Sequence, residues 1–148
     1  MRHLSILLLF VFCSFKSDCQ SIDKADAICG KWMSAEKNLA VEVYRVQGTY
    51  KAKIIYFTGG VTRDKPMETI TDKKNPNPAL RERKVLGLNV LEGLTYNGNN
   101  SWENGTIYEV QSGKYWNAAA HLDTNGLLKV KGYWHVKLIG KTMVFRRM

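Results

Sequence analysis

The side chains closest to catalytic chemistry in this sequence are His121 and Asp123, which stand two positions apart. In a β-strand this spacing puts an imidazole and a carboxylate on the same face. A catalytic pair also needs a nucleophile, and the sequence offers no candidate beside them. We therefore interpret His121 as a hydrogen-bonded histidine at a strand end, and we expect no catalytic residues.

Motifs that mark the common metal and nucleophile sites are missing. The sequence contains no Cys-x-x-Cys, no His-Glu-x-x-His, no Gly-x-Ser-x-Gly and no phosphate-cradling glycine loop. It therefore predicts neither a metal site nor a cofactor, and no enzymatic activity.

Residues 114–122 contain three successive alanines, Ala118 to Ala120, and alternation puts Trp116, Ala118 and Ala120 on one face of the expected strand. Small side chains that point into a barrel leave room, which favours a cavity for an apolar or flat ligand. The candidate ligand-binding residues lie on this segment, on neighbouring strands and on a long loop: Tyr108, Trp116, Ala118, Ala120, Trp134, Arg81 and Arg83. The alternative is that small and large residues alternate only to fill a tapering barrel.

Basic residues are concentrated near the C-terminus of a chain whose formal net charge is +9. No acidic residue follows Asp123, whereas several basic ones do: Lys129, Lys131, Lys137, Lys141, Arg146 and Arg147. We interpret them as a solvated outer face; the alternative is attraction to an anionic envelope surface such as lipid headgroups or acidic polysaccharide. Nucleic acid is not an expected partner, because no nucleic-acid motif is present.

Apolar side chains alternate with polar ones from Gly30 to the end of the chain, which indicates β-strands. These strands must position the residues named above. Asn- and Gly-rich turns separate the segments. We expect strands over 30–33, 39–44, 50–57, 86–96, 105–110, 114–122, 127–134 and 141–147. Strands without crossover helices avoid exposed edges by closing on themselves. The sequence thus predicts an all-β fold: a single up-and-down antiparallel barrel of about eight strands.

One connection, residues 58–85, is long, polar and contains all 3 prolines. Within it Asn77 is a candidate N-cap and Pro78 a first helical residue, which predicts a short helix. A loop of this length is usually functional or a lid; the equal alternative is a plug that closes one end of the barrel.

The first nineteen residues read as a secretory signal peptide. A basic start precedes an apolar run of roughly a dozen residues, too short for a membrane-spanning helix. Cleavage before Gln20 would leave a domain over 20–148, exported to the periplasm or the outside, with Cys29 as its one thiol. A lipoprotein anchor on Cys19 is less favoured, because the charged Lys16-Ser17-Asp18 precedes that cysteine.

Two patterns resemble known families. Gly30-Lys31-Trp32 at the start of the first strand and Arg147 at the end of the last resemble the arrangement of calycins, the lipocalin-like barrels. An arginine stacked on an indole would seal such a barrel, so Gly30, Trp32 and Arg147 are structural candidates. The run from Asp72 to Arg83, with Trp102-x-Asn104-Gly105 and Gly113-Lys114-x-Trp116, resembles Domain of Unknown Function 2147, small exported bacterial proteins. That resemblance implies export and a calycin-like barrel.

Two functions follow as expectations. The first is an exported, non-catalytic protein that binds a small lipophilic ligand inside its barrel. The second is an envelope interaction module with a filled barrel, which docks through its basic outer face.

Overall fold

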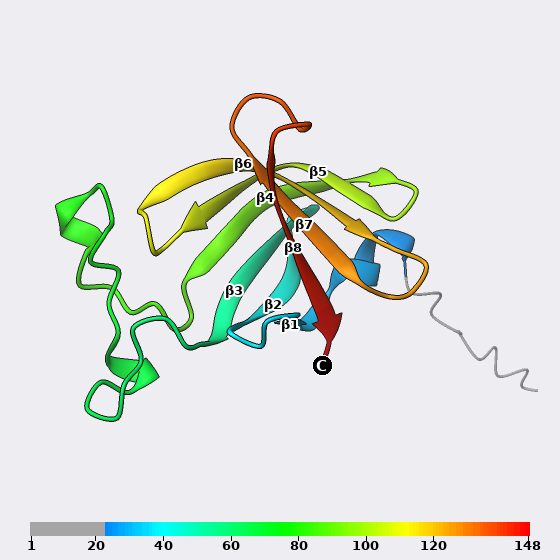
Figure 1. Ribbon diagram of the computed structural model, residues 1–148. Helices are drawn as coiled ribbons and strands as arrows, with labels where there is room; N and C mark the ends of the chain where they lie inside the picture. The colour runs from blue at the N-terminus through cyan, green and yellow to red at the C-terminus, as the bar shows by residue number, and fades with distance from the viewer. Residues whose placement is uncertain (1–22) are drawn as a thin grey trace, which may run out of the picture.

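The alternating segments fold as eight antiparallel strands in a computed structural model that describes residues 23–148 (Figure 1). The strands are β1 (Gly30–Ser34), β2 (Leu39–Val46), β3 (Thr49–Phe57), β4 (Asn89–Gly98), β5 (Ser101–Glu109), β6 (Lys114–Leu122), β7 (Leu128–Tyr133) and β8 (Gly140–Arg147). Each pairs with the next, and β1 pairs with β8. The predicted up-and-down barrel is confirmed. The predicted signal peptide, with cleavage before Gln20 and the alternative anchor on Cys19, lies outside the described residues.

Tight turns fix where the strands begin and end. Asn99 and Asn100 both have positive φ, 49° and 54°, as a two-residue hairpin turn requires. This turn lets β5 begin at Ser101, four positions before the start predicted at Gly105.

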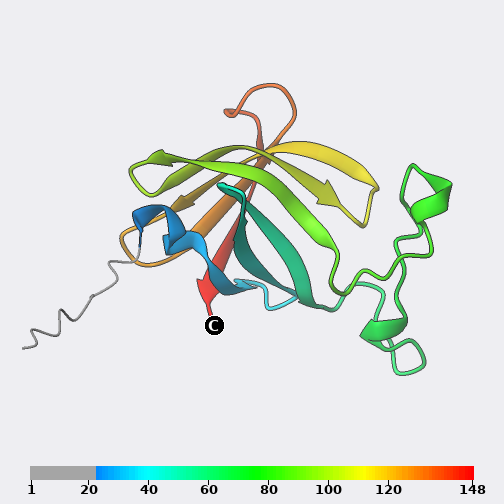
Figure 2. The same cartoon turned by 180° about the vertical axis from the view of Figure 1, so that it is seen from behind.

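The two ends of the barrel differ. A 3-10 helix that the sequence analysis missed, η1 (Lys24–Ile28), covers one end, and the long β3–β4 connection extends from the other (Figures 1 and 2). Because the strands run up and down, the β1–β2, β3–β4, β5–β6 and β7–β8 connections all lie at the end opposite η1. We call these the closed end and the open end. No helix within 23–148 is long and apolar enough to cross a membrane.

The long connection carries two single-turn 3-10 helices, η2 (Met67–Thr69) and η3 (Pro78–Leu80). The second is the predicted short helix: the Asn77 side chain accepts a hydrogen bond from the backbone N–H of Ala79 at 3.1 Å, and Pro78 takes the first position.

The first and last strands meet where Arg147 stacks on Trp32, with the guanidinium carbon 4.2 Å from the ring centroid. The same guanidinium donates hydrogen bonds to the backbone carbonyls of Cys29 (2.7 Å) and Ala27 (2.6 Å). Gly30 has a φ of 126°, and a Cβ there would lie 2.6 Å from an Arg147 nitrogen. Arg147 therefore ties β8 to β1 and to η1, and glycine at position 30 leaves it room.

Arg147→Ala should lower the free energy of unfolding by about 2 kcal/mol, because it removes a cation–π contact and two charge-assisted hydrogen bonds. Arg146→Ala is the matched control, because Arg146 is exposed and lies on the other face of β8; its effect should stay within about 0.5 kcal/mol. Urea unfolding measures both. Equal losses in the two variants would contradict this role of Arg147.

Candidate functional site

Strands β5 to β8 line one side of the barrel interior with small side chains. Their register places Gly105, Ala118, Gly132 and Lys141 side by side in one row. Directly opposed residues share a face of an antiparallel sheet, and Ala118 is fully buried in the core of the barrel. The whole row therefore faces inward, and three of its four members have no side chain beyond Cβ.

Towards the closed end the interior is a packed core. Trp32, Tyr50, Leu94 and Trp102 are each at most 1% exposed. A Cβ on Gly105 would come within 2.8 Å of Leu94 Cδ2, so this leucine occupies the space that the glycine leaves. Here small and large residues do fit together, as the filled-barrel alternative expected.

Several inward-facing side chains of β5 to β8 are only half-buried. Ile107 lies opposite Trp116 towards the open end, and Val130 lies opposite Met143 in the row that also holds Trp102 and Ala120; Ile107, Trp116, Val130 and Met143 all have intermediate exposure. The first strand ends at Ser34, which pairs with Phe145, so the part of β8 before Phe145 extends past the end of β1. We call the inner face of β5 to β8 that these four half-buried side chains form the cup.

An aromatic rim borders the cup. The rings of Trp116 and Trp134 meet edge to face with centroids 5.7 Å apart. With Lys114 and Tyr115 they line a shallow groove. Asn117 Nδ2 donates a 2.6 Å hydrogen bond to the Trp134 carbonyl, which fixes the start of the β7–β8 loop against β6.

The structure brings together some of the predicted ligand-binding residues. Trp116, Ala118 and Ala120 share the inward face of β6, and Trp134 lies at the rim. Tyr108 does not join them. It lies opposite Tyr115, on the other face of the sheet from Trp116.

Tyr108 instead belongs to a buried polar cluster with the long loop. Its hydroxyl donates to Asp72 Oδ1 at 2.6 Å, and Asp72 Oδ2 accepts from Asn75 Nδ2 (2.8 Å) and from Arg83 Nε (2.9 Å). Asp72 is 0% and Asn75 1% exposed. Arg81 Nε donates to the Asn75 carbonyl at 2.8 Å. The two predicted arginines therefore serve the fold of the loop itself.

Two further contacts hold the loop against the barrel. A Cβ on Gly113, in the β5–β6 turn, would collide with the Lys74 carbonyl oxygen, so the loop packs directly on that turn. A small apolar cluster of Ile54, Phe57 and Val85 lies beneath the loop. Asp72 and Asn75 were not among the predicted site residues, although the family-like run from Asp72 to Arg83 contains both.

Burial raises the pKa of Tyr108 to about 12, and its hydrogen bond to Asp72 adds to the shift. The buried carboxylate receives donors from three side chains, so the cluster is satisfied when Tyr108 keeps its proton.

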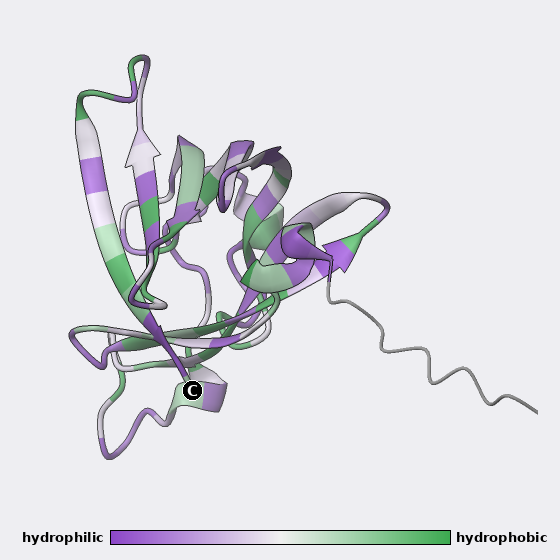
Figure 3. Cartoon of the chain, turned by 90° about the vertical axis from the view of Figure 1, so that its right-hand side faces the viewer, coloured by the Kyte–Doolittle hydropathy of each residue, from purple (hydrophilic) through white to green (hydrophobic). Residues whose placement is uncertain are grey.

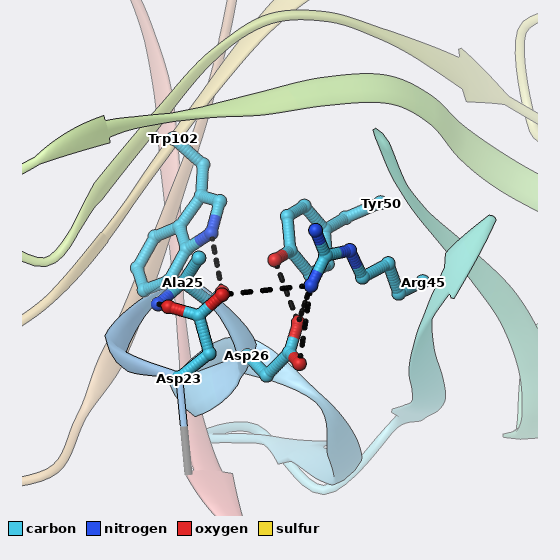
Figure 4. A network of polar contacts seen from close by, with 6 residues as sticks. All are labelled: Asp23, Ala25, Asp26, Arg45, Tyr50 and Trp102. Carbon is cyan, nitrogen blue, oxygen red and sulfur yellow. Dashed lines mark hydrogen bonds and ion pairs between the residues drawn. The ribbon is translucent and has the colours of Figure 1, made fainter. Parts of the chain in front are cut away.

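A second polar network holds η1 at the closed end (Figure 4). Tyr50 donates to Asp26 Oδ1 at 2.7 Å, and Arg45 reaches the same carboxylate at 3.2 Å. Trp102 Nε1 donates to the Ala25 carbonyl at 3.0 Å. Burial, followed by the hydrogen bond to Asp26, raises the pKa of Tyr50. These contacts anchor η1 over the packed core.

The side chains of His121 and Asp123 each have a polar partner nearby in the structure. His121 Nδ1 lies 3.0 Å from Ser101 Oγ. The Asp123 carboxylate accepts from the backbone N–H groups of Asn125 and Leu127 and pairs with Lys129 at 3.2 Å. Burial raises the pKa of Cys29, which disfavours its thiolate. Within 23–148 no group of three or more His, Cys, Asp or Glu side chains could hold a metal ion.

Comparisons with known proteins agree with this architecture. Residues 30–147 match the family described as an uncharacterized protein conserved in bacteria, DUF2147. A solved structure, protein HP1028 from the human pathogen Helicobacter pylori, is similar with a TM-score of 0.69 and 26% sequence identity. The match covers 81% of this chain and 82% of that one, which is described as belonging to the lipocalin family. No curated protein matches the chain.

The free energy of unfolding at alkaline pH should report the contribution of Tyr108 to the loop cluster. A tyrosine whose folded pKa is about 12, against about 10 unfolded, stabilises the fold fully below pH 10 and loses that contribution as the pH rises towards 12. The free energy of unfolding should therefore fall across this window. In Tyr108→Phe the fall should be smaller, and stability at neutral pH should drop by about 1–3 kcal/mol.

Tyr115→Phe is the control, because Tyr115 is 49% exposed beside Tyr108. It should leave the pH dependence unchanged. Chemical unfolding from pH 8 to 12, with tyrosinate absorbance recorded in parallel, measures both variants. A Tyr108 that ionises with the exposed tyrosines would refute the burial argument.

Proposed function

The chain belongs to the DUF2147 family of bacterial proteins and has a lipocalin-like barrel, and we propose that it binds a small lipophilic ligand inside that barrel, at the cup. The ligand is held non-covalently, without catalysis. The observation that carries the proposal is the set of half-buried apolar side chains on the inner face of β5 to β8: Ile107, Trp116, Val130 and Met143.

Apolar surface that water can reach gives a ligand a binding free energy that a filled core cannot offer. The row of Gly105, Ala118 and Gly132 supplies width, and the rings of Trp116 and Trp134 supply flat surfaces near the entrance. This combination of small and aromatic walls suits an acyl chain or a flat ring system.

Lys141 adds a polar element to the cup. It shares the inward row with Gly132 and is exposed. Within 23–148 its ammonium takes part in no salt bridge, unlike those of Lys129 and Lys137. A cation at the edge of an apolar cavity favours an amphiphile with an anionic head, so a fatty acid is a suitable probe.

The second candidate is an envelope module with a filled barrel. The packed core around Trp32 and Trp102 favours it. The half-buried Ile107 and Trp116 favour the first candidate, because a filled barrel would bury these inward-facing side chains as fully as Leu128, which is 1% exposed.

Export is part of the proposal. The apolar run that begins at Leu4 and the small residues Ser17 and Cys19 before Gln20 support removal of a signal peptide. A protein released beyond the cytoplasmic membrane would meet lipophilic molecules in the envelope.

Gly132→Val should weaken binding of a fluorescent fatty acid roughly tenfold or more. A Cβ at position 132 would make ordinary contacts with Trp116 Cβ (3.6 Å) and Ile107 Cδ1 (3.8 Å), so the fold tolerates it. The added methyl groups would then occupy the cup. Fluorescence titration of the purified protein measures the dissociation constant.

Ala119→Val is the matched control, because Ala119 lies on the outward face of β6 opposite Lys131. It adds the same kind of bulk outside the barrel and should leave affinity unchanged. Equal weakening by both variants, or saturable binding that neither affects, would refute the cup as the site.

Intact-mass measurement of the protein released from the bacterial periplasm tests export. The expected species begins at Gln20. A species that retains Met1, found only in the cytoplasm, would contradict export and leave the ligand titration unaffected.

A further inference from the structure

The β7–β8 loop, residues 134–139, presents a cluster of exposed apolar side chains. Trp134 is 57%, Val136 56%, Leu138 92% and Ile139 73% exposed. Figure 3 shows the loop projecting beyond the rest of the barrel, with hydrophobic segments at its tip. Large apolar side chains exposed together, rather than singly, mark an interaction site.

The fold itself gives no reason for these side chains. The loop leaves β7 after Tyr133 and returns at Gly140, a separation that a short polar turn could span. Its contacts with the barrel use other groups: the Trp134 carbonyl accepts from Asn117, and Lys137 pairs with Glu103. The apolar side chains of Leu138 and Ile139 remain directed to solvent.

Basic residues lie on the strands that adjoin the loop. Lys114 lines the groove beside Trp134, Lys131 lies on the outward face of β7, and Lys141 is the second residue of β8. In the part of the chain that the structure describes, none of these three lysines forms a salt bridge. The two nearby acids are already engaged, Glu103 with Lys137 and Glu109 with Ser112.

We propose that the β7–β8 loop docks the protein on an anionic lipid bilayer, with Leu138 and Ile139 inserted among the acyl chains and Trp134 at the headgroup level. Apolar tips flanked by tryptophan and lysine match the layered chemistry of a membrane interface. The lysines add attraction to anionic headgroups, each contributing near the surface. A lipid surface needs no shape complementarity, which suits a protruding loop better than a flat protein partner does.

The loop belongs to the open end of the barrel, beside Trp116 and the cup. Docking would therefore bring the entrance of the cup close to the bilayer. The proposal does not rest on ligand binding, because its evidence is the exposure and charge of the loop alone.

Vesicle flotation tests the proposal with two compositions, phosphatidylcholine alone and phosphatidylcholine mixed with phosphatidylglycerol. The wild-type protein should bind the anionic vesicles and show a blue shift of tryptophan fluorescence that Trp134→Phe removes. The double variant Leu138→Ser/Ile139→Ser should reduce binding at least tenfold. Lys131→Gln/Lys141→Gln should reduce binding to the anionic vesicles and weaken its salt dependence.

The matched control is Tyr56→Ser/Leu80→Ser, which removes two apolar side chains of 38% and 36% exposure elsewhere on the surface. It should bind vesicles as the wild type does. Thermal unfolding confirms that each variant is folded, which is expected because the loop side chains are exposed.

Three results would overturn the proposal. They are absence of vesicle binding, binding that the Leu138/Ile139 variant leaves unchanged, and wild-type dimers in sedimentation velocity that this variant abolishes. The last would assign the loop to a second copy of the chain. Fatty-acid affinity of the loop variant in solution separates the two proposals, since it should equal that of the wild type.

Discussion

Closure of the barrel between β1 and β8 is the constraint on which the other features depend. This seam is short: three residues of β1 pair with three of β8. Arg147 reinforces it by stacking on Trp32 and by donating to two carbonyls at the end of η1. One guanidinium therefore joins both terminal strands and the covering helix. Without the seam, β1 and β8 would be free edges and the inner apolar face would be open to water along its length.

The interior of the closed barrel has two halves that differ in packing. The half near η1 is packed solid around Trp102, whereas the inward-facing Ile107 and Trp116 in the other half are only half-buried. At each end of the barrel a tyrosine hydroxyl donates a hydrogen bond to an aspartate: Tyr50 to Asp26 of η1, and Tyr108 to Asp72 of the long β3–β4 connection. The same device thus anchors η1 at one end and the long loop at the other, so that neither segment has to fill the cup.

Much of the fold could be predicted, because alternation and turn chemistry are local signals. The inward placement of Trp116, Ala118 and Ala120 followed from the same alternation. Tyr108 shows its limit. Counting in twos from Trp102 would place Tyr108 inside, but a bulge sets four residues of β5, from Trp102 to Gly105, against three of β6, from Ala120 to Ala118. Beyond the bulge Gly105 and Ile107 therefore face inward, and Tyr108 faces outward.

The loop cluster escaped prediction for a different reason. Asp72 contacts a tyrosine 36 positions away in the sequence, and no local pattern reports a contact of that range. Arg81 and Arg83 were therefore predicted to bind the ligand, whereas in the structure they hold the loop.

The central claim, a barrel packed at one end and open at the other, is tested most directly by NMR with a spin-labelled fatty acid. Paramagnetic broadening should reach the backbone amides of Ile107, Trp116 and Gly132 and spare those of Leu94 and Trp102. Broadening confined to the outer face, at Tyr115 and Asn117, or spread evenly over the chain, would show that the inner cup is not a binding site.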